Sequence, residues 1–218
     1  GFAERANEWL QMARGHYLLR RAPDLMNGAA GWGMTELKFW IETGLPTHLQ
    51  AAEDAARAVI DSAEEEDGAW KWKSFYGYCP GLGHGSAGMG LFLSYLYAAT
   101  GNEKYLHAAE RALRYVLRTA KDTPDGTSWK VFEGHPTHTP YWRWGSAGVG
   151  IALLRYLAVA PDPDPELQDL LDHFVRVAVG HQRCLDSLRL SGGSELPRAI
   201  PVSDPQRSVR RREIMARR

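Results

Sequence analysis

One histidine stands out because of the glycines around it. His84 lies in the segment Gly81-Leu82-Gly83-His84-Gly85-Ser86-Ala87-Gly88, directly before a stretch with helical periodicity. Imidazoles titrate near neutral pH, so a histidine at a helix entrance can accept or donate a proton during catalysis. The alternative is a turn residue whose ring hydrogen-bonds to a neighbouring backbone carbonyl. His84 is therefore a candidate general acid or base.

A second candidate is Arg143, which stands between Trp142 and Trp144 ahead of another helical stretch. Because a guanidinium does not lose its charge, it can stabilise a developing oxyanion or pair with a substrate carboxylate. The alternative is an arginine that only stacks between two tryptophans. Trp142, Trp144 and Tyr78 are candidate substrate-binding residues, since exposed aromatic rings on loops suit a peptide or a sugar.

Metal and nucleotide sites are weakly indicated. Cys79, Cys184, His84, His135 and His138 offer ligand atoms, but their spacing does not match a zinc motif, and we expect no metal. His135 and His138 are interpreted as solvated loop residues. The glycines around His84 also fit a dinucleotide fingerprint, but that motif needs a preceding strand, which the sequence lacks.

The glycines belong to an internal repeat. Three runs, at residues 28–33, 85–90 and 145–150, begin 57 and 60 residues apart. The same register aligns residues 51–57 with 108–114, and we align Trp70-Lys71-Trp72 with Trp129-Lys130-Val131. One unit is thus a glycine turn, an inner helix, a short turn, an outer helix and a long irregular loop. The predicted structural glycine turns are Gly28, Gly31, Gly85, Gly88, Gly145 and Gly148.

The periodicity predicts an all-α fold. Apolar residues recur at helical spacing from Met89 to Tyr97 and from Val149 to Leu157, with few charges, which indicates inner helices. Outer helices such as residues 108–118 have one charged face. Strand signals are weak. The chain holds about three and a half such units, because its first residues already follow the outer-helix pattern, so we expect a piece of a longer repeat protein.

Composition divides the chain and limits its partners. Residues 1–186 carry the repeats, whereas residues 187–218 are rich in arginine, glycine and proline and are predicted to be a disordered tail. Equal numbers of basic and acidic residues, 26 each, argue against nucleic acid. No run reaches the roughly 18 apolar residues of a membrane helix. Two cysteines and no signal peptide favour a cytoplasmic protein.

The repeated glycine runs, with His84 and Trp142 in front of two of them, resemble the lanthionine synthetase C-like (LanC-like) family. The resemblance covers roughly residues 1–180 and implies an (α/α) toroid, here an incomplete ring. The family's cyclases add a cysteine thiol to a dehydroalanine or dehydrobutyrine of a precursor peptide, closing a thioether ring. Their motifs have the forms G-x-x-H-G-x-x-G, W-C-x-G and C-H-G, and cysteines and histidine of the last two bind zinc.

Only part of that site carries over. His84 matches the motif histidine, and Trp142 and Gly145 match W-C-x-G, but Arg143 occupies the position of the zinc-binding cysteine. No C-H-G motif occurs, and Cys184 is not followed by histidine. The resemblance is therefore to degenerate members without zinc, such as cyclase domains fused behind kinase-like domains, or to a piece that ends before the last motif.

We predict a LanC-like cyclase domain acting on a precursor peptide or another thiol-containing substrate. His84 would protonate the enolate formed by thiol addition, and Arg143 would stabilise it. The activity is expected to be lost or to depend on a missing part of the protein. One alternative is a non-catalytic peptide-binding module. Another is a glycoside hydrolase of toroid fold, whose two carboxylates would come from these loop acids: Asp61, Glu64, Glu65, Glu66, Asp67, Asp122, Asp125 and Glu133.

Overall fold

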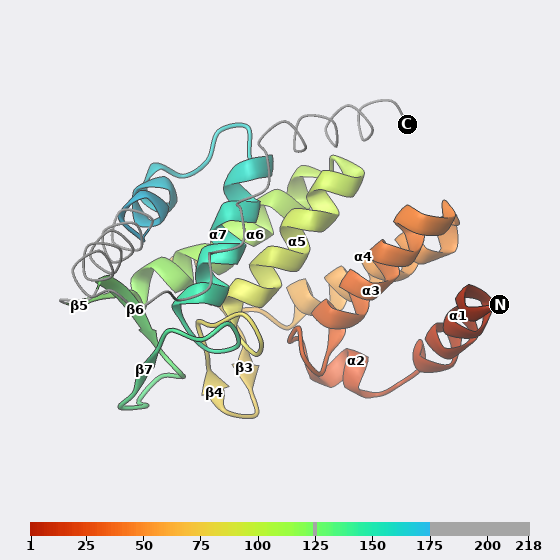
Figure 1. The fold of residues 1–218 in the computed structure, drawn as a ribbon, viewed down its shortest axis with the longest axis horizontal. Helices are drawn as coiled ribbons and strands as arrows, with labels where there is room; N and C mark the ends of the chain where they lie inside the picture. The colour runs from red at the N-terminus through yellow and green to blue at the C-terminus, as the bar shows by residue number, and fades with distance from the viewer. Residues whose placement is uncertain (124–125, 175–218) are drawn as a thin grey trace, which may run out of the picture. The chain divides into compact units, whose positions relative to one another are not determined.

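The computed structural model describes residues 1–123 and 126–174, which are mostly helical, as the sequence predicts (Figure 1). No helix in these ranges is long and apolar enough to cross a bilayer. The predicted boundary at residues 186 and 187 and the predicted tail lie outside the described residues. The helices are α1 (Phe2–Ala13), α2 (Leu18–Arg21), α3 (Ala29–Thr43), α4 (Pro46–Asp61), α5 (Ser86–Thr100), α6 (Glu103–Arg118) and α7 (Ser146–Val159), and residues 165–174 are also helical.

The long loops of the repeat contain short antiparallel strands. Our prediction that these loops are irregular was therefore wrong. These strands are two to five residues long, too short to produce a recognisable alternation in the sequence. β1 pairs with β2, β3 with β4, and β6 lies between β5 and β7. The strands are β1 (Glu64–Glu66), β2 (Ala69–Lys71), β3 (Lys73–Ser74), β4 (Gly77–Tyr78), β5 (Lys121–Thr123), β6 (Gly126–Lys130) and β7 (His138–Thr139).

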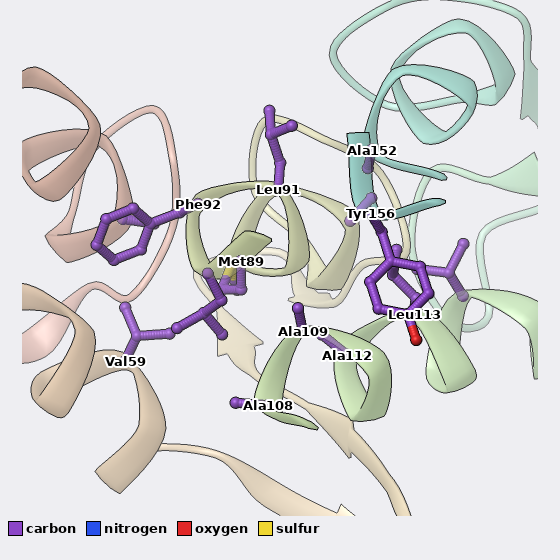
Figure 2. Close-up of a cluster of buried hydrophobic side chains, with 14 of the residues drawn as sticks. Val59, Met89, Leu91, Phe92, Ala108, Ala109, Ala112, Leu113, Ala152 and Tyr156 are labelled. Atoms are coloured by element: carbon purple, nitrogen blue, oxygen red, sulfur yellow. The ribbon is translucent and has the colours of Figure 1, made fainter. Parts of the chain in front are cut away.

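The helices pair as the repeat requires. α3 packs on α4 and α5 on α6, and the inner helix α5 also contacts α3 and α7. Inner helices end at Gly44 and Gly101 in the left-handed conformation, with φ of 70° and 68°. Figure 2 shows the resulting core, in which buried side chains of α5 meet those of α4, α6 and α7. Most of the predicted inner-helix residues are buried, among them Met89, Phe92, Val149 and Tyr156, whereas Tyr97 and Leu157 are half-buried.

Each inner helix begins under a turn of its own preceding loop. The first helical amides donate to carbonyls of that loop: the Ser86 N–H bonds to the Cys79 oxygen at 3.0 Å and the Ala29 N–H to the Ala22 oxygen at 2.8 Å. This satisfies donors that a helix N-terminus leaves unpaired, without any side-chain cap.

Only glycine permits that close approach. A Cβ on the first glycine of each run would overlap a carbonyl of the loop, and so would a Cβ on the glycine three residues later. The first pairs are Gly28 with Ala22, Gly85 with Cys79, and Gly145 with Thr139. The second pairs are Gly31 with Leu25, Gly88 with Leu82, and Gly148 with Trp142. The six predicted glycine turns therefore serve backbone packing rather than ligand binding.

Two loop tryptophans are core residues that fix each loop to its outer helix. The Trp72 indole N–H donates to the Val59 carbonyl at 2.7 Å, and the Trp129 indole N–H donates to the Val116 carbonyl at 2.8 Å. Both rings are almost fully buried. The repeat therefore equates Trp72 with Trp129, which corrects our alignment of Trp70 with Trp129. That alignment was wrong because it matched neighbouring letters rather than the spacing from the outer helix.

We expect Gly88→Ala to destabilise the fold, although alanine in a helix interior normally gains about 1 kcal/mol over glycine. The added Cβ would meet the Leu82 carbonyl, and overpacking of this kind costs about 1–3 kcal/mol. Urea unfolding measures the change. Gly15→Ala is the control, because a Cβ at Gly15 meets nothing within 4 Å. If Gly88→Ala and Gly15→Ala unfold at the same urea concentration, the contact between a Cβ at residue 88 and the Leu82 carbonyl does not destabilise the fold, and the prediction is wrong.

Candidate functional site

Equivalent positions of the three repeats meet at one end of the inner helices. The Met26 N–H donates to the Gly83 carbonyl at 3.1 Å, and the Gly83 N–H donates to the Arg143 carbonyl at 2.8 Å. Met26, Gly83 and Arg143 each stand two residues before the first glycine of a run. The loops before α5 and α7, and the β3–β4 hairpin, lie at the same end of these helices (Figure 1). The following residues, Asn27, His84 and Trp144, are brought together in this way.

Three polar side chains, those of Asp24, His84 and Arg143, form a hydrogen-bonded array where the three repeats meet. His84, 1% exposed, lies with Nδ1 3.0 Å from the Asp24 Oδ2 atom. On the other side of the ring, the Arg143 Nε and Nη2 atoms lie 3.0 and 2.5 Å from His84 Nε2. Asp24 is itself 5% exposed and accepts the Asn27 backbone N–H at 2.6 Å. The array therefore runs from a carboxylate through an imidazole to a guanidinium.

Donor and acceptor chemistry fixes the proton in this array. A guanidinium has only donors, so the His84 Nε2 atom accepts from Arg143. The ring proton is then on Nδ1, where it is donated to Asp24. This is the arrangement in which a carboxylate orients a histidine whose other nitrogen faces the substrate. Here that nitrogen faces Arg143.

Aromatic rings enclose the imidazole. The Trp144 ring lies 4.7 Å from the His84 ring at 36°, and the Tyr76 ring lies 5.3 Å away. Tyr76 also meets Trp144 edge-on at 5.0 Å. The Arg143 guanidinium carbon lies 4.9 Å from the centre of the Trp144 ring, a cation–π distance. Arg143 is thus stacked on one of the two predicted tryptophans, Trp144, and hydrogen-bonded to His84 at the same time. Its role in stabilising an oxyanion stays a prediction.

Next to the array, four exposed aromatic residues form what we call the aromatic rim: Phe75, Tyr76, Tyr141 and Trp142. Their exposed fractions run from 41% for Tyr76 to 96% for Phe75. Phe75 and Tyr76 form the tip of the β3–β4 hairpin, and Tyr141 and Trp142 precede Arg143 in the next loop. Exposed rings of this kind on two neighbouring loops suit the side chains of a peptide.

The sequence-predicted residues are placed as follows. His84, Arg143 and Trp144 lie together, and Trp142 directly precedes Arg143 and is exposed. Tyr78 does not contact them: its hydroxyl donates to Glu64 at 2.5 Å, and the Lys71 ammonium lies over its ring. Its place in β4 directs the side chain toward β1, and Tyr76 in the hairpin turn reaches the site instead.

Several residues of the site were not predicted: Asp24, Asn27 and Tyr76 around His84, and Phe75 and Tyr141 on the rim. A signal for Asp24 existed, because it precedes the first glycine run by the same interval that separates Gly81 and Tyr141 from the next two runs. We used that run only as a structural marker. At this position the second and third repeats have Gly81 and Tyr141, so an acidic residue in the first repeat is a difference that could have indicated a role for Asp24. Tyr76 carries no such signal, since it depends on the hairpin.

The possible metal ligands do not gather. Within residues 1–123 and 126–174 no three His, Cys, Asp or Glu side chains are arranged to hold a metal ion. His135 accepts the Thr137 N–H, and His138 pairs with Ser128. Burial raises the pKa of the Cys79 thiol, which lies 3.5 Å from the Ser74 hydroxyl and donates to the Gly77 carbonyl at 3.8 Å. Cys184 lies outside the described residues.

Arg143 also makes a zinc ion unsuited to this position. Its donors point at the one nitrogen of His84 that could bind a metal, and a guanidinium is not a ligand. The donor set therefore does not fit the zinc site that the sequence resemblance implies for active cyclases.

The loop acids considered for glycoside hydrolysis are mostly paired one by one. Glu65 pairs with Arg111 and Glu66 with Lys71, both at 3.0 Å, and Glu133 accepts the Tyr115 hydroxyl at 2.9 Å. Asp125 lies outside the described residues. No contact joins two of the described loop acids across a common space, so no specific observation favours this chemistry.

Comparison with known proteins identifies the family of the chain. A family model described as lanthionine synthetase C-like protein matches residues 2–191. No curated protein matches the chain.

Asp24→Asn is expected to weaken the array, because the amide cannot replace a charged acceptor of the His84 N–H. Hydrogen bonds to charged groups contribute about 1.5–3 kcal/mol, so we expect a loss near the lower end of that range in the free energy of urea unfolding. Asp54→Asn is the control, since Asp54 forms an exposed ion pair with Arg57 and such pairs contribute about 0–1 kcal/mol. A loss no larger than that of the control would show that Asp24 does not hold His84.

Proposed function

This chain belongs to the lanthionine synthetase C-like family, and we propose that it binds a dehydrated precursor peptide and assists the closure of thioether rings. In this reaction a cysteine thiol adds to the Cβ atom of a dehydroalanine or dehydrobutyrine. The π electrons move toward the carbonyl to give an enolate, and the α-carbon then takes up the proton that the thiol lost. No oxidant or reductant is needed.

The observation that carries this proposal is the Asp24–His84–Arg143 array. Once its Nε2 atom is available, His84 can accept the thiol proton and return it to the α-carbon. Asp24, bonded to Nδ1 at 3.0 Å, holds the ring in place and stabilises the imidazolium that forms between the two transfers. Arg143 supplies a fixed positive charge for the enolate oxygen.

We further propose that this chemistry proceeds without zinc. In the family the metal deprotonates the substrate thiol, a task that a free thiol of pKa about 8.5 otherwise leaves largely undone at neutral pH. Arg143 stands where the zinc-binding cysteine of the family motif would be. A guanidinium near the thiol favours the thiolate by charge alone, which is a weaker effect than coordination. We therefore expect slow catalysis.

The aromatic rim is proposed to hold the peptide. Tyr76 contacts the His84 ring, and Tyr141 and Trp142 directly precede Arg143 in the chain, so a peptide bound over the rim would have its reacting residues close to His84 and Arg143. The dehydrated residues must come from a separate dehydration step, which a kinase-like partner domain could begin.

A second candidate function, a module that only holds the peptide, is favoured by one observation. Both ring nitrogens of His84 are already engaged, Nδ1 by Asp24 and Nε2 by Arg143. A module of this kind would keep the aromatic rim and present the peptide to another active site.

The variants His84→Ala and Arg143→Ala decide between these functions. A dehydrated peptide is incubated with the whole chain, and free thiols are then alkylated before mass spectrometry, because ring closure leaves the peptide mass unchanged. General acid–base catalysis contributes about 100-fold or more, so we expect His84→Ala to lower ring closure by at least that factor. His107→Ala, on the exposed face of α6, is the control.

Three outcomes are distinguishable in that experiment. Loss of ring closure in both variants with retained binding supports catalysis at the array. Loss of binding when the parent closes no rings supports the peptide-holding module. If both variants bind and cyclise as the parent does, the proposed site is wrong.

Metal content is a separate prediction. Protein purified without chelators should contain far less than one zinc per chain by elemental analysis, because Arg143 blocks the available nitrogen of His84. Arg143→Cys restores the family's residue at that position and should raise the zinc content if His84 is then free. Stoichiometric zinc in the parent protein would contradict the assignment.

A further inference from the structure

Arg143 is a half-buried cation whose hydrogen-bonding capacity is largely unused. Its Nε and Nη2 atoms both point at the single lone pair of His84 Nε2. Among the residues that the structure describes, no carboxylate lies within ion-pair distance of its guanidinium. Arg14, Arg57, Arg111 and Arg114, by contrast, each meet a carboxylate. At least one edge of the Arg143 fork therefore faces no acceptor.

The same contact blocks His84. While Arg143 donates to Nε2, that nitrogen can neither accept a proton nor donate one, and Nδ1 is held by Asp24. The Arg143 guanidinium is retained by one neutral acceptor and by the face of Trp144. A carboxylate is a stronger partner, because it carries charge and offers two oxygens that match the guanidinium fork.

We infer that the site is selective for peptides with a side-chain carboxylate beside the reacting cysteine, and that this carboxylate draws Arg143 away from His84. Binding of an acidic peptide would then free Nε2 at the moment when a thiol is present. This inference rests on the proposed function, since it takes a peptide as the ligand. It adds the chemical class of that peptide, and it adds that binding of the peptide makes the Nε2 atom of His84 available.

The arrangement also explains why the guanidinium can move without disturbing the loop. The Arg143 backbone is fixed independently, through its carbonyl and the Gly83 N–H at 2.8 Å. The side chain can therefore change its rotamer while the stacked rings of Trp144 and Tyr76 keep their places around His84. Asp24 keeps its own hydrogen bond to Nδ1 of His84 when Arg143 moves to a carboxylate of the peptide.

The test uses two peptides, each acetylated at the N-terminus and amidated at the C-terminus, that contain one cysteine and differ only in Asp or Asn beside it. Neither contains a dehydrated residue, so no ring can close. Calorimetry on the whole chain should give about tenfold tighter binding for the Asp peptide, the size expected for one charge-assisted contact. A third peptide, the Asn form with a free C-terminus, distinguishes a terminal carboxylate from a side-chain one.

Two variants locate the effect. Arg143→Met should bind both amidated peptides equally, whereas Arg155→Met should keep the preference, because Arg155 lies on α7 against Tyr95. Nitrogen NMR of the imidazoles reads the state of His84, whose signal is identified by its loss in His84→Ala. The Asp peptide should move the Nε2 signal of the parent toward its position in Arg143→Met, and the Asn peptide should not.

Equal binding of the two amidated peptides to the parent protein overturns the inference while leaving the proposed function intact. A preference that persists in Arg143→Met, or equally tight binding of the free C-terminus, also overturns it. An unchanged Nε2 signal on binding of the Asp peptide shows that Arg143 does not leave His84. The inference that the peptide frees the Nε2 atom is then wrong. Binding of neither peptide overturns the inference, while the proposed function is decided by the ring-closure experiment with the dehydrated peptide.

Discussion

The architecture depends on the approach of a loop carbonyl to the first turn of each inner helix. At that point the backbone of the loop takes the place of a side-chain cap, and the helix amides donate directly to it. No atom beyond the Cα fits between them, so glycine is required on the helix side, first at Gly28, Gly85 and Gly145 and again three residues later. Because the loop is held this closely, the residues just before each run have little freedom, and their positions relative to one another follow from the packing of the helices.

Repetition then becomes a means of assembling a site. Asn27, His84 and Trp144 are equivalents of one another in three successive units, and the same geometry that stacks the units brings them together. In a repeat with identical residues this would give three copies of one side chain. Here the copies have diverged into an amide, an imidazole and an indole, and the neighbouring positions supply Asp24 and Arg143. The chemistry of the site lies in the differences between units whose backbones are alike.

Periodicity and the glycine runs were sufficient to predict the helices, their pairing and the position of the turns, because all three follow from local spacing. His84 and Arg143 could be named for the same reason, since each stands at a fixed distance from a glycine. Tyr78 was predicted and Tyr76 was not, because the β3–β4 turn, which places Tyr76 against His84, is too short to leave a pattern in the sequence. Asp24 was missed because its role depends on a contact across 60 residues. The engagement of both nitrogens of His84 is likewise a property of the packed structure.

The bonds that tie the three loops together, from Met26 to Gly83 and from Gly83 to Arg143, use main-chain atoms alone. These bonds between the loops therefore do not involve the side chain that residue 143 carries. A lineage can exchange a cysteine for an arginine at this position, or reverse the exchange, without altering the loop that presents it. The fold and the chemistry of the site can therefore evolve separately. One substitution at residue 143 can remove a metal ligand while the backbone of the fold stays the same and can serve a different reaction.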